Sequence, residues 1–151
     1  MNANLPKGAM ISVGMTKEEA VSRCPEGLYV ACHNSENNVS ISGPEDAIRA
    51  FAKQLDSEDV FCREVKSSGY AFHSEYMKPC EDSLREALQE IIKERKPRSS
   101  KWVSTSVEGS LLETDLGLYS SVDYHVNNVL SPVLFKMALD QIPPKAVVLE
   151  L

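Results

Sequence analysis

The sequence predicts an α+β fold, in which a ferredoxin-like subdomain is followed by part of a larger α/β layer. Residues 8–66 alternate in the order strand, helix, strand, strand, helix, strand, which is the ferredoxin-like (βαββαβ) plan. Residues 77–92 instead carry an apolar stripe at helical spacing, and the elements after them are too few to complete a second core. We therefore expect a small subdomain at 8–70 and a partial large subdomain at 71–151.

The elements of the first half follow from local signals. The run 8–14 (GAMISVG) is short, apolar and bounded by glycines, which is typical of a strand. A helix is predicted at 16–24, where the letters TKEE form a capping-box pattern. The runs 28–34 and 38–43 predict a hairpin, because the turn-forming letters SENN join them. Pro44 then opens a helix, in whose first turn a missing N–H costs little, and a last strand covers 60–65.

The second half is less regular, and its pieces look like part of a sheet whose other strands lie elsewhere. The final run AVVLEL is apolar throughout, as in an interior parallel strand, yet it has little to pair with. The expected elements are, in order, a helix over 77–92 stopped by Pro97, a strand at 101–106, an irregular stretch at 107–121, a helix at 123–130, a helix from Ser131-Pro132 to about 141 and a strand at 146–151.

The composition excludes several classes of function. A net charge of −6 and a pI near 5.1 argue against nucleic-acid binding, which needs a basic surface. No apolar run approaches the roughly 20 residues that a bilayer span needs, so we expect no membrane insertion. The first ten residues lack the apolar core of a secretory signal, which predicts a cytoplasmic protein. The cysteines form no C-x-x-C pair, so we expect reduced, half-buried thiols and no zinc site; they are Cys24, Cys32, Cys62 and Cys80.

A single histidine, His73, marks the junction between the two halves in the letters GYAFHSEYM. Imidazole titrates near pH 6.5, so a histidine at the end of a strand suits the role of a general base. It equally suits a purely structural role, as a polar group at the N-terminus of the following helix. The sequence contains no G-x-S-x-G nucleophile elbow. Ser74 is expected to cap the following helix, and Cys80 lies on the apolar stripe. The residues therefore offer a base without its nucleophile.

An ordered set of motifs gives the chain a resemblance. The pieces are GAMISVG, ACHNSENNVSISGP, VFCREVKSSGYAFHSEYM, RKPRSSKWVSTS and DYHVNNVLSPVLF with AVVLEL. In this order the chain resembles the malonyl/acetyl-CoA:acyl-carrier-protein transacylase domain of animal-type fatty acid synthases. The resemblance implies an α/β-hydrolase-like large subdomain into which a ferredoxin-like subdomain is inserted.

The resemblance also implies roles for individual residues. His73 takes the position of the catalytic base in a ping-pong mechanism, where a serine carries the acyl group between CoA and the carrier protein. Phe72 precedes it, as in acyltransferases that choose malonyl over methylmalonyl units. Asn34 and Met10 are implied to line the substrate cleft, and residues 126–128 to lie near the histidine.

The same resemblance implies the partners and an incomplete catalytic site. The partners are malonyl-CoA or acetyl-CoA, an acyl carrier protein bearing phosphopantetheine, and the rest of a synthase; no cofactor is bound by this domain. The family's nucleophilic serine and its carboxylate-binding arginine match nothing here. We therefore expect a fragment that is inactive alone and whose uncovered apolar surface favours self-association.

Three other readings of the sequence stay open. The chain fits the acyltransferase domain of a polyketide synthase, a carrier-binding module without chemistry, or a thioester hydrolase that uses a cysteine. The basic run 93–101 (KERKPRSSK) suits either an acidic partner, such as the carrier or a CoA phosphate, or a solvated helix end.

Overall fold

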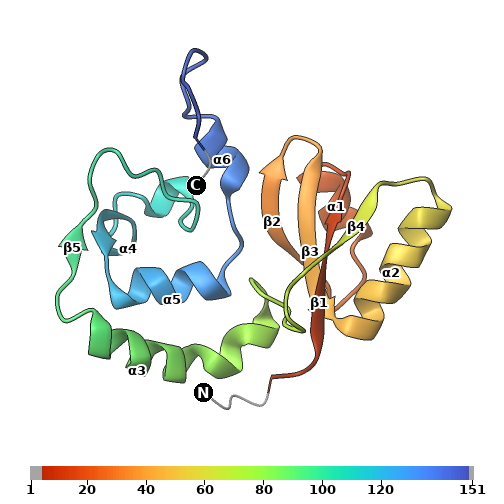
Figure 1. Cartoon of the computed structure of the whole chain (residues 1–151), viewed down its shortest axis with the longest axis horizontal. Helices are drawn as coiled ribbons and strands as arrows, with labels where there is room; N and C mark the ends of the chain where they lie inside the picture. Colours follow the sequence, from red (N-terminus) through yellow and green to blue (C-terminus); the bar gives the residue numbers. More distant parts are fainter. Residues whose placement is uncertain (1–4, 150–151) are drawn as a thin grey trace.

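The computed structural model describes residues 5–149, and its first half has the predicted order of elements (Figure 1). Four strands form one antiparallel sheet in the order β2-β3-β1-β4. The prediction of strand, helix, strand, strand, helix, strand is therefore confirmed. The elements are β1 (Gly8–Val13), α1 (Lys17–Arg23), β2 (Tyr29–Ser35), β3 (Asn38–Pro44), α2 (Glu45–Ser57) and β4 (Cys62–Val65).

Local chemistry sets the ends of these elements as the sequence predicts. Thr16 accepts a hydrogen bond from the backbone of Glu19, whose carboxylate accepts one from Thr16 N at 2.9 Å, so the capping box is complete. Pro44 is the residue that precedes α2. β2 and β3 pair from Tyr29 with Ser42 to Ser35 with Asn38, which leaves a short turn and confirms the hairpin.

The core of this half lies between one face of the sheet and the helices α1 and α2. Side chains alternate across a strand, so Ile11 and Val13 point into this core while Met10 and Ser12 point to the opposite face. The core combines the following buried residues: Ala9, Ile11, Val13, Met15, Ala20, Leu28, Val39, Ile41, Ile48, Phe51 and Leu55.

The second half is built mainly from helices and carries only a two-stranded pairing of β5 with β6 (Figure 1). Its elements are the 3₁₀ helix η1 (Glu75–Cys80), α3 (Glu81–Ile91), β5 (Lys96–Pro97), the 3₁₀ helix η2 (Gly109–Leu111), α4 (Asp115–Leu118), β6 (Tyr119–Ser120), α5 (Val122–Leu130) and α6 (Phe135–Leu139). The helix predicted at 123–130 is confirmed as α5. The stretch 107–121, predicted to be irregular, contains η2, α4 and β6.

Two predicted strands are wrong. Residues 101–106 form no strand, although Thr105 O accepts a hydrogen bond from Leu134 N at 2.7 Å. Residues 146–149 form none either and are exposed, while 150–151 lie outside the described residues. Both predictions rested on local sequence alone, the apolar run at 146–151 and the run KWVSTS at 101–106, but a strand requires a neighbour to complete its hydrogen bonds, and neither run pairs with a described strand.

Two predicted helices have different bounds. The helix predicted at 77–92 begins as 3₁₀ structure containing Pro79, which lacks the N–H and would clash inside an α-helix, so α3 starts only at Glu81. The second helix begins at Phe135 rather than at Ser131-Pro132. Ser131 instead follows the C-terminus of α5, where its N–H donates to Asn127 O at 2.8 Å.

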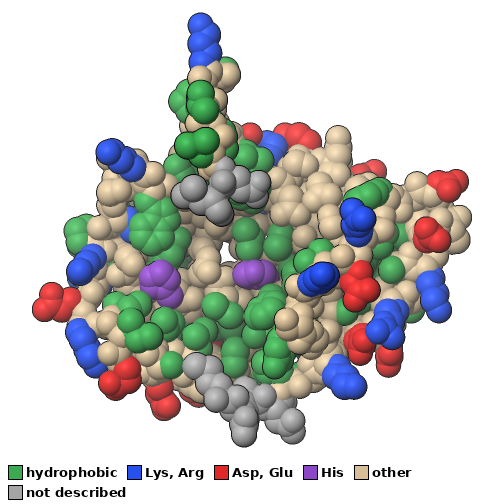
Figure 2. Space-filling view, viewed as in Figure 1, with side chains coloured by type: hydrophobic (Ala, Val, Ile, Leu, Met, Phe, Trp, Pro, Cys, Tyr) green, Lys and Arg blue, Asp and Glu red, His purple; other side chains and the backbone are tan. Residues whose placement is uncertain are grey.

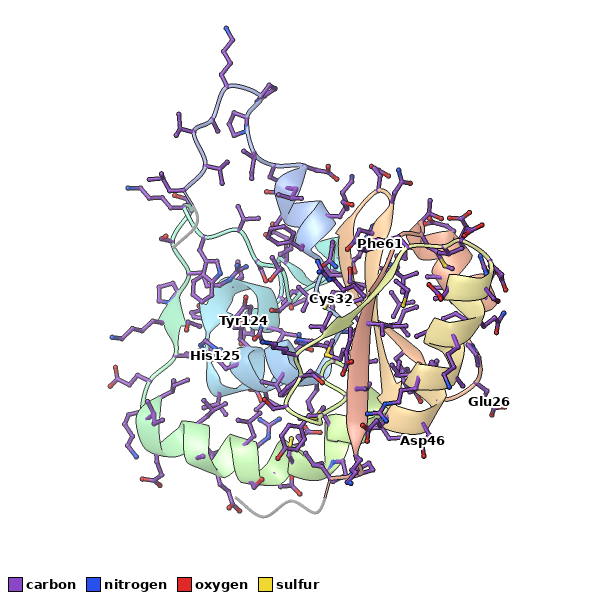
Figure 3. All side chains as sticks on the ribbon, turned by 45° about the vertical axis from the view of Figure 1, so that its right-hand side comes forward. Glu26, Cys32, Asp46, Phe61, Tyr124 and His125 are labelled. Atoms are coloured by element: carbon purple, nitrogen blue, oxygen red, sulfur yellow. The ribbon has the colours of Figure 1, made fainter. Side chains whose placement is uncertain are left out.

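The two halves are joined along the β2 edge of the sheet. Val133 exchanges two backbone hydrogen bonds with this strand, from His33 N to Val133 O and from Val133 N to Ala31 O, each 2.8 Å long. Lys136 adds an ion pair with Glu36 at 2.7 Å. Figure 3 shows Cys32 at this edge, with α5 beyond it. Among residues 5–149, no helix has the length and apolarity to cross a membrane.

Candidate active site

His73 stands in a tight turn between the sheet and η1, and its backbone is strained. Its φ is 59°, in the left-handed region that costs a non-glycine residue about 1–2 kcal/mol. The side chain of Ser74 is buried and donates to Ala71 O at 2.6 Å, which closes the turn. Strain of this kind persists only where the surroundings fix it, and it concentrates at functional sites. Ser74 therefore does not cap η1 through its side chain, contrary to the sequence prediction.

The turn is pressed against the start of β1. Gly8 N donates to Gly69 O at 2.8 Å. A Cβ on Gly8 would lie 2.3 Å from Ala71 N and 2.7 Å from Ala71 Cβ, which are impossible distances. The glycine thus allows the backbone of the histidine turn to approach the strand, so the position of His73 depends on β1.

The ring of His73 is held by a carbonyl from the second half. Its Nδ1 lies 3.0 Å from Ser131 O. Because a carbonyl only accepts, Nδ1 must carry the proton of the neutral ring, and Nε2 is left with a free lone pair. This tautomer is the one that a general base needs.

Burial lowers the pKa of His73 below its usual value of 6.5, against smaller raising effects from hydrogen bonds to the carbonyls of Ser131 and Asn128. The ring is therefore neutral and ready to accept a proton at neutral pH. The contact with Asn128 confirms the expectation that residues 126–128 lie near the histidine.

Phe72 lies beside this ring. Its side chain is half-buried, with its ring centre 6.4 Å from that of His73 and 5.8 Å from that of Tyr70. A bulky ring next to the base narrows the space available to a substrate. The role implied by the resemblance, a preference for unbranched acyl units, is compatible with this position.

The other two predicted site residues, Met10 and Asn34, do not hydrogen-bond to His73. Met10 is only 5% exposed, in the centre of β1. Asn34 donates from Nδ2 to Asn38 Oδ1 at 2.8 Å and to Ser40 Oγ at 3.1 Å, within a polar cluster on the sheet. Both residues lie in the sheet that supports the turn, and their contact with substrate stays a prediction.

A cavity of about 340 Å³ opens beside the segment that holds His73. Ser131 and Asn127 line it together with His33 of β2, and its other walls are mainly apolar. His73 itself is not among the lining residues. Figure 2 shows histidine side chains on this face of the molecule, below a hollow between the two halves.

The basic run 93–101 is largely engaged within the chain. Arg95 pairs with Asp115 and stacks over the ring of Tyr119 at 4.2 Å. Arg98 lies 5.5 Å from the ring centres of both Trp102 and Tyr124, and its Nε donates to Gly117 O. These contacts give the run a structural role and leave fewer free cations for an acidic partner. Figure 3 shows Tyr124 on α5, next to His125.

The thiols are poorly suited to nucleophilic attack. All four cysteines are free, and burial raises the pKa of each. For Cys24 the pKa rises to about 11. Because the thiolate is the reactive form, this argues against the hydrolase that would use a cysteine.

Sequence reasoning missed the partner of the histidine. Ser131 was expected to start a helix, yet its carbonyl orients the ring from 58 positions away. No residue type signals a backbone carbonyl. The only clue was Pro132, which prevents the helix before it from continuing and so leaves a carbonyl free of helical bonds.

A strained histidine in its base tautomer, at the seam of an α+β fold, suits proteins that transfer or hydrolyse groups with a general base. Comparison with protein families makes this specific. The family model described as "Acyl transferase domain" matches residues 1–151. The chain therefore belongs to the acyl transferase domain family.

The curated relatives are fungal polyketide synthases. The highly reducing polyketide synthase Preu1 of Preussia isomera is 36% identical over 141 residues, covering 89% of this chain and 6% of that protein. The fusarielin synthase FSL1 of Gibberella zeae is 38% identical over 143 residues, covering 88% of this chain and 5% of that protein. The chain thus spans a small part of these proteins. The comparisons favour the polyketide synthase alternative over the animal fatty acid synthase domain that the sequence motifs resemble.

Solved structures agree on the fold. The acyltransferase domain from the second module of the salinomycin polyketide synthase has 29% identity and a TM-score of 0.67, over 87% of this chain and 30% of that one. A loading acyltransferase from the avermectin modular polyketide synthase has 22% identity and a TM-score of 0.74, over 92% of this chain and 45% of that one. The second likeness shows the fold alone.

Proposed function

We propose that this chain supplies the general base of an acyltransferase that loads a polyketide-type synthase. Residues 8–70 would form a ferredoxin-like small subdomain and residues 71–151 part of the large subdomain. The observation that carries the proposal is the hydrogen bond from His73 Nδ1 to Ser131 O, because it leaves Nε2 free to accept a proton.

The nucleophile would come from another part of the acyltransferase. Within residues 5–149, the His73 side chain hydrogen-bonds to backbone carbonyls and to no hydroxyl or thiol. In the first step, Nε2 takes the proton of a serine hydroxyl while its oxygen attacks the thioester carbon of an acyl-CoA. The C–S bond breaks, and the proton passes to the departing CoA thiolate.

The second step reverses the first on a different thiol. The phosphopantetheine thiol of a carrier protein gives its proton to Nε2 and attacks the acyl-serine ester. The C–O bond breaks, and the serine oxygen takes the proton back. A histidine with a lowered pKa suits both steps, because it is neutral when each thiol or hydroxyl must be deprotonated.

The acyl group that we propose is malonyl, and the partners are acyl-CoA, a carrier protein and the remaining synthase domains. Phe72 supports this choice, because its ring lies beside the base, where an α-methyl branch would need room. Met10 and Asn34 are weaker candidates for substrate contact. The amide nitrogen of Asn34 is already engaged, so its Oδ1 is the atom left for a ligand.

A chimera tests the proposal. Residues 1–151 replace the matching segment in the acyltransferase domain of the Preussia isomera relative, and transfer of labelled malonyl and methylmalonyl groups from CoA to carrier protein is measured. We expect malonyl transfer in the chimera, and a loss of at least about 10²-fold in His73→Ala, which is the lower range for a general base.

The matched control is His125→Gln. His125 lies in α5, and its Nε2 is 3.0 Å from Ser120 Oγ, so its ring is engaged away from His73. It should leave transfer near the level of the parent chimera. Full transfer by the His73→Ala chimera would overturn the proposal and would favour the carrier-binding module without chemistry.

A further inference from the structure

We propose that Asn127 is a positioning residue, which fixes the Nδ1–H tautomer of His73 by orienting the carbonyl of Ser131. The catalytic meaning of this role rests on the proposed function, but the structural role does not. The Asn127 side chain hydrogen-bonds to Ser106 and Ser131 and not to the imidazole, so it would act through Ser131.

Asn127 holds Ser131 by two hydrogen bonds. Its backbone carbonyl accepts from Ser131 N at 2.8 Å, at the end of α5. Its side-chain Oδ1 accepts from Ser131 Oγ at 2.7 Å. One residue thus fixes both the backbone and the side chain of the residue whose carbonyl meets His73 Nδ1 at 3.0 Å.

The amide of Asn127 is itself fixed in one orientation. Its Nδ2 donates to Ser106 O at 2.6 Å, so the nitrogen must point toward Ser106 and the oxygen toward Ser131. Ser106 is buried, which makes this anchor part of the interior of the second half. A continuous path of three side-chain hydrogen bonds therefore runs from the Ser106 backbone to the imidazole.

The side chain must be an amide for this arrangement to form. An aspartate could accept from Ser131 Oγ, but it has no donor for Ser106 O and would place a negative charge against that carbonyl. An alanine removes both bonds. Without the clamp, the peptide after Ser131 gains freedom, and the Ser131 carbonyl no longer holds Nδ1 at a fixed position.

The test uses the full 151-residue chain labelled with ¹⁵N at histidine. Long-range ¹H–¹⁵N correlation spectra distinguish a protonated ring nitrogen from an unprotonated one, and His73→Gln identifies the signals of His73. At pH 7.5 the parent chain should show Nδ1 protonated and Nε2 unprotonated. Asn127→Ala should shift His73 to a mixture of tautomers or to the Nε2–H form.

Two further variants keep the test decisive if Asn127→Ala fails to fold. Ser131→Ala keeps the backbone and removes only the hydroxyl, so it should shift the tautomer in the same direction. Ser131→Thr keeps a hydroxyl and should restore the parent pattern. Asn38→Ala is the matched control, because Asn38 also makes two side-chain contacts, with Asn34 and Ser12, and it should leave the His73 signals unchanged.

The outcomes separate this inference from the proposed function. An unchanged His73 tautomer in a folded Asn127→Ala or Ser131→Ala chain overturns the positioning role, whatever the chimera does. A changed tautomer together with a chimera that transfers acyl groups without His73 supports the positioning role and overturns the function.

Discussion

At the scale of single residues, His73 combines a left-handed backbone, a half-buried ring and a carbonyl acceptor on Nδ1. The sequence could predict the histidine, because AFHS at a strand-to-helix junction is a local signal. It could not predict the strained φ or the carbonyl. Both depend on how distant segments meet, and a carbonyl is common to every residue type.

The lowered pKa of His73 predicts a pH dependence of folding. In the unfolded chain this histidine takes up a proton near pH 6.5, whereas in the folded chain it does so only at a lower pH. The unfolded state then binds more protons, so the free energy of unfolding falls as the pH drops below about 6.5, until the folded ring also titrates. Urea unfolding between pH 7.5 and 5.0 measures this.

The comparison uses two variants. His73→Gln should flatten this part of the profile, because glutamine does not titrate. His125→Gln should keep it. Equal pH profiles in the parent chain and in His73→Gln would show that the ring is not held neutral by the fold.

At the scale of elements, the sequence predicted the first half well, because its signals are local. A capping box begins α1, a proline precedes α2, and period-two alternation marks β3. The failures at 101–106 and 146–149 have a different cause. There the local sequence favours a strand, through apolar residues at 146–149 and through Trp, Val and Thr at 101–106, but a strand also needs neighbouring strands to pair with, and these cannot be read from local sequence.

Gly8 offers a test of how the sheet supports the histidine turn. Gly8→Ala would place a Cβ 2.3 Å from Ala71 N, so either β1 or the turn must move. We expect the free energy of unfolding to fall by about 1–3 kcal/mol, as for other overpacked sites, together with a shift of the His73 NMR signals.

The control for this test is Gly109→Ala. A Cβ at Gly109 meets nothing within 4 Å, so we expect a change within about 0.5 kcal/mol. If Gly8→Ala were as stable as Gly109→Ala, the close approach of the turn to β1 would not constrain the site.

At the scale of the whole molecule, the two halves differ in how completely they bury apolar side chains. The first half has a closed core between its sheet and two helices. In the second half no residue of α3 is fully buried, and Ile91 is 78% exposed. The described residues after α6, 140–149, form a loop that protrudes from the body (Figure 1), in which Val147 is 89% and Leu149 82% exposed.

Such apolar exposure predicts self-association of the chain. Sedimentation velocity should show species larger than the monomer, with a share that rises with concentration. Replacing Val147 and Val148 with lysine should lower that share. Val21→Lys on α1 is the control, since Val21 is 62% exposed but lies in the other half. A parent chain that stays monomeric and binds no hydrophobic dye would contradict the prediction.

The backbone pairing of Val133 with β2 has a mechanical consequence. Val133 lies two positions after Ser131. The peptide whose carbonyl binds the imidazole is therefore attached by nearby backbone hydrogen bonds to the sheet of the opposite half. A rotation of one half relative to the other would therefore displace the Ser131 peptide. The basicity of His73 would then depend on how closely the two halves approach each other. The relative position of the halves would thus control the reactivity of the histidine.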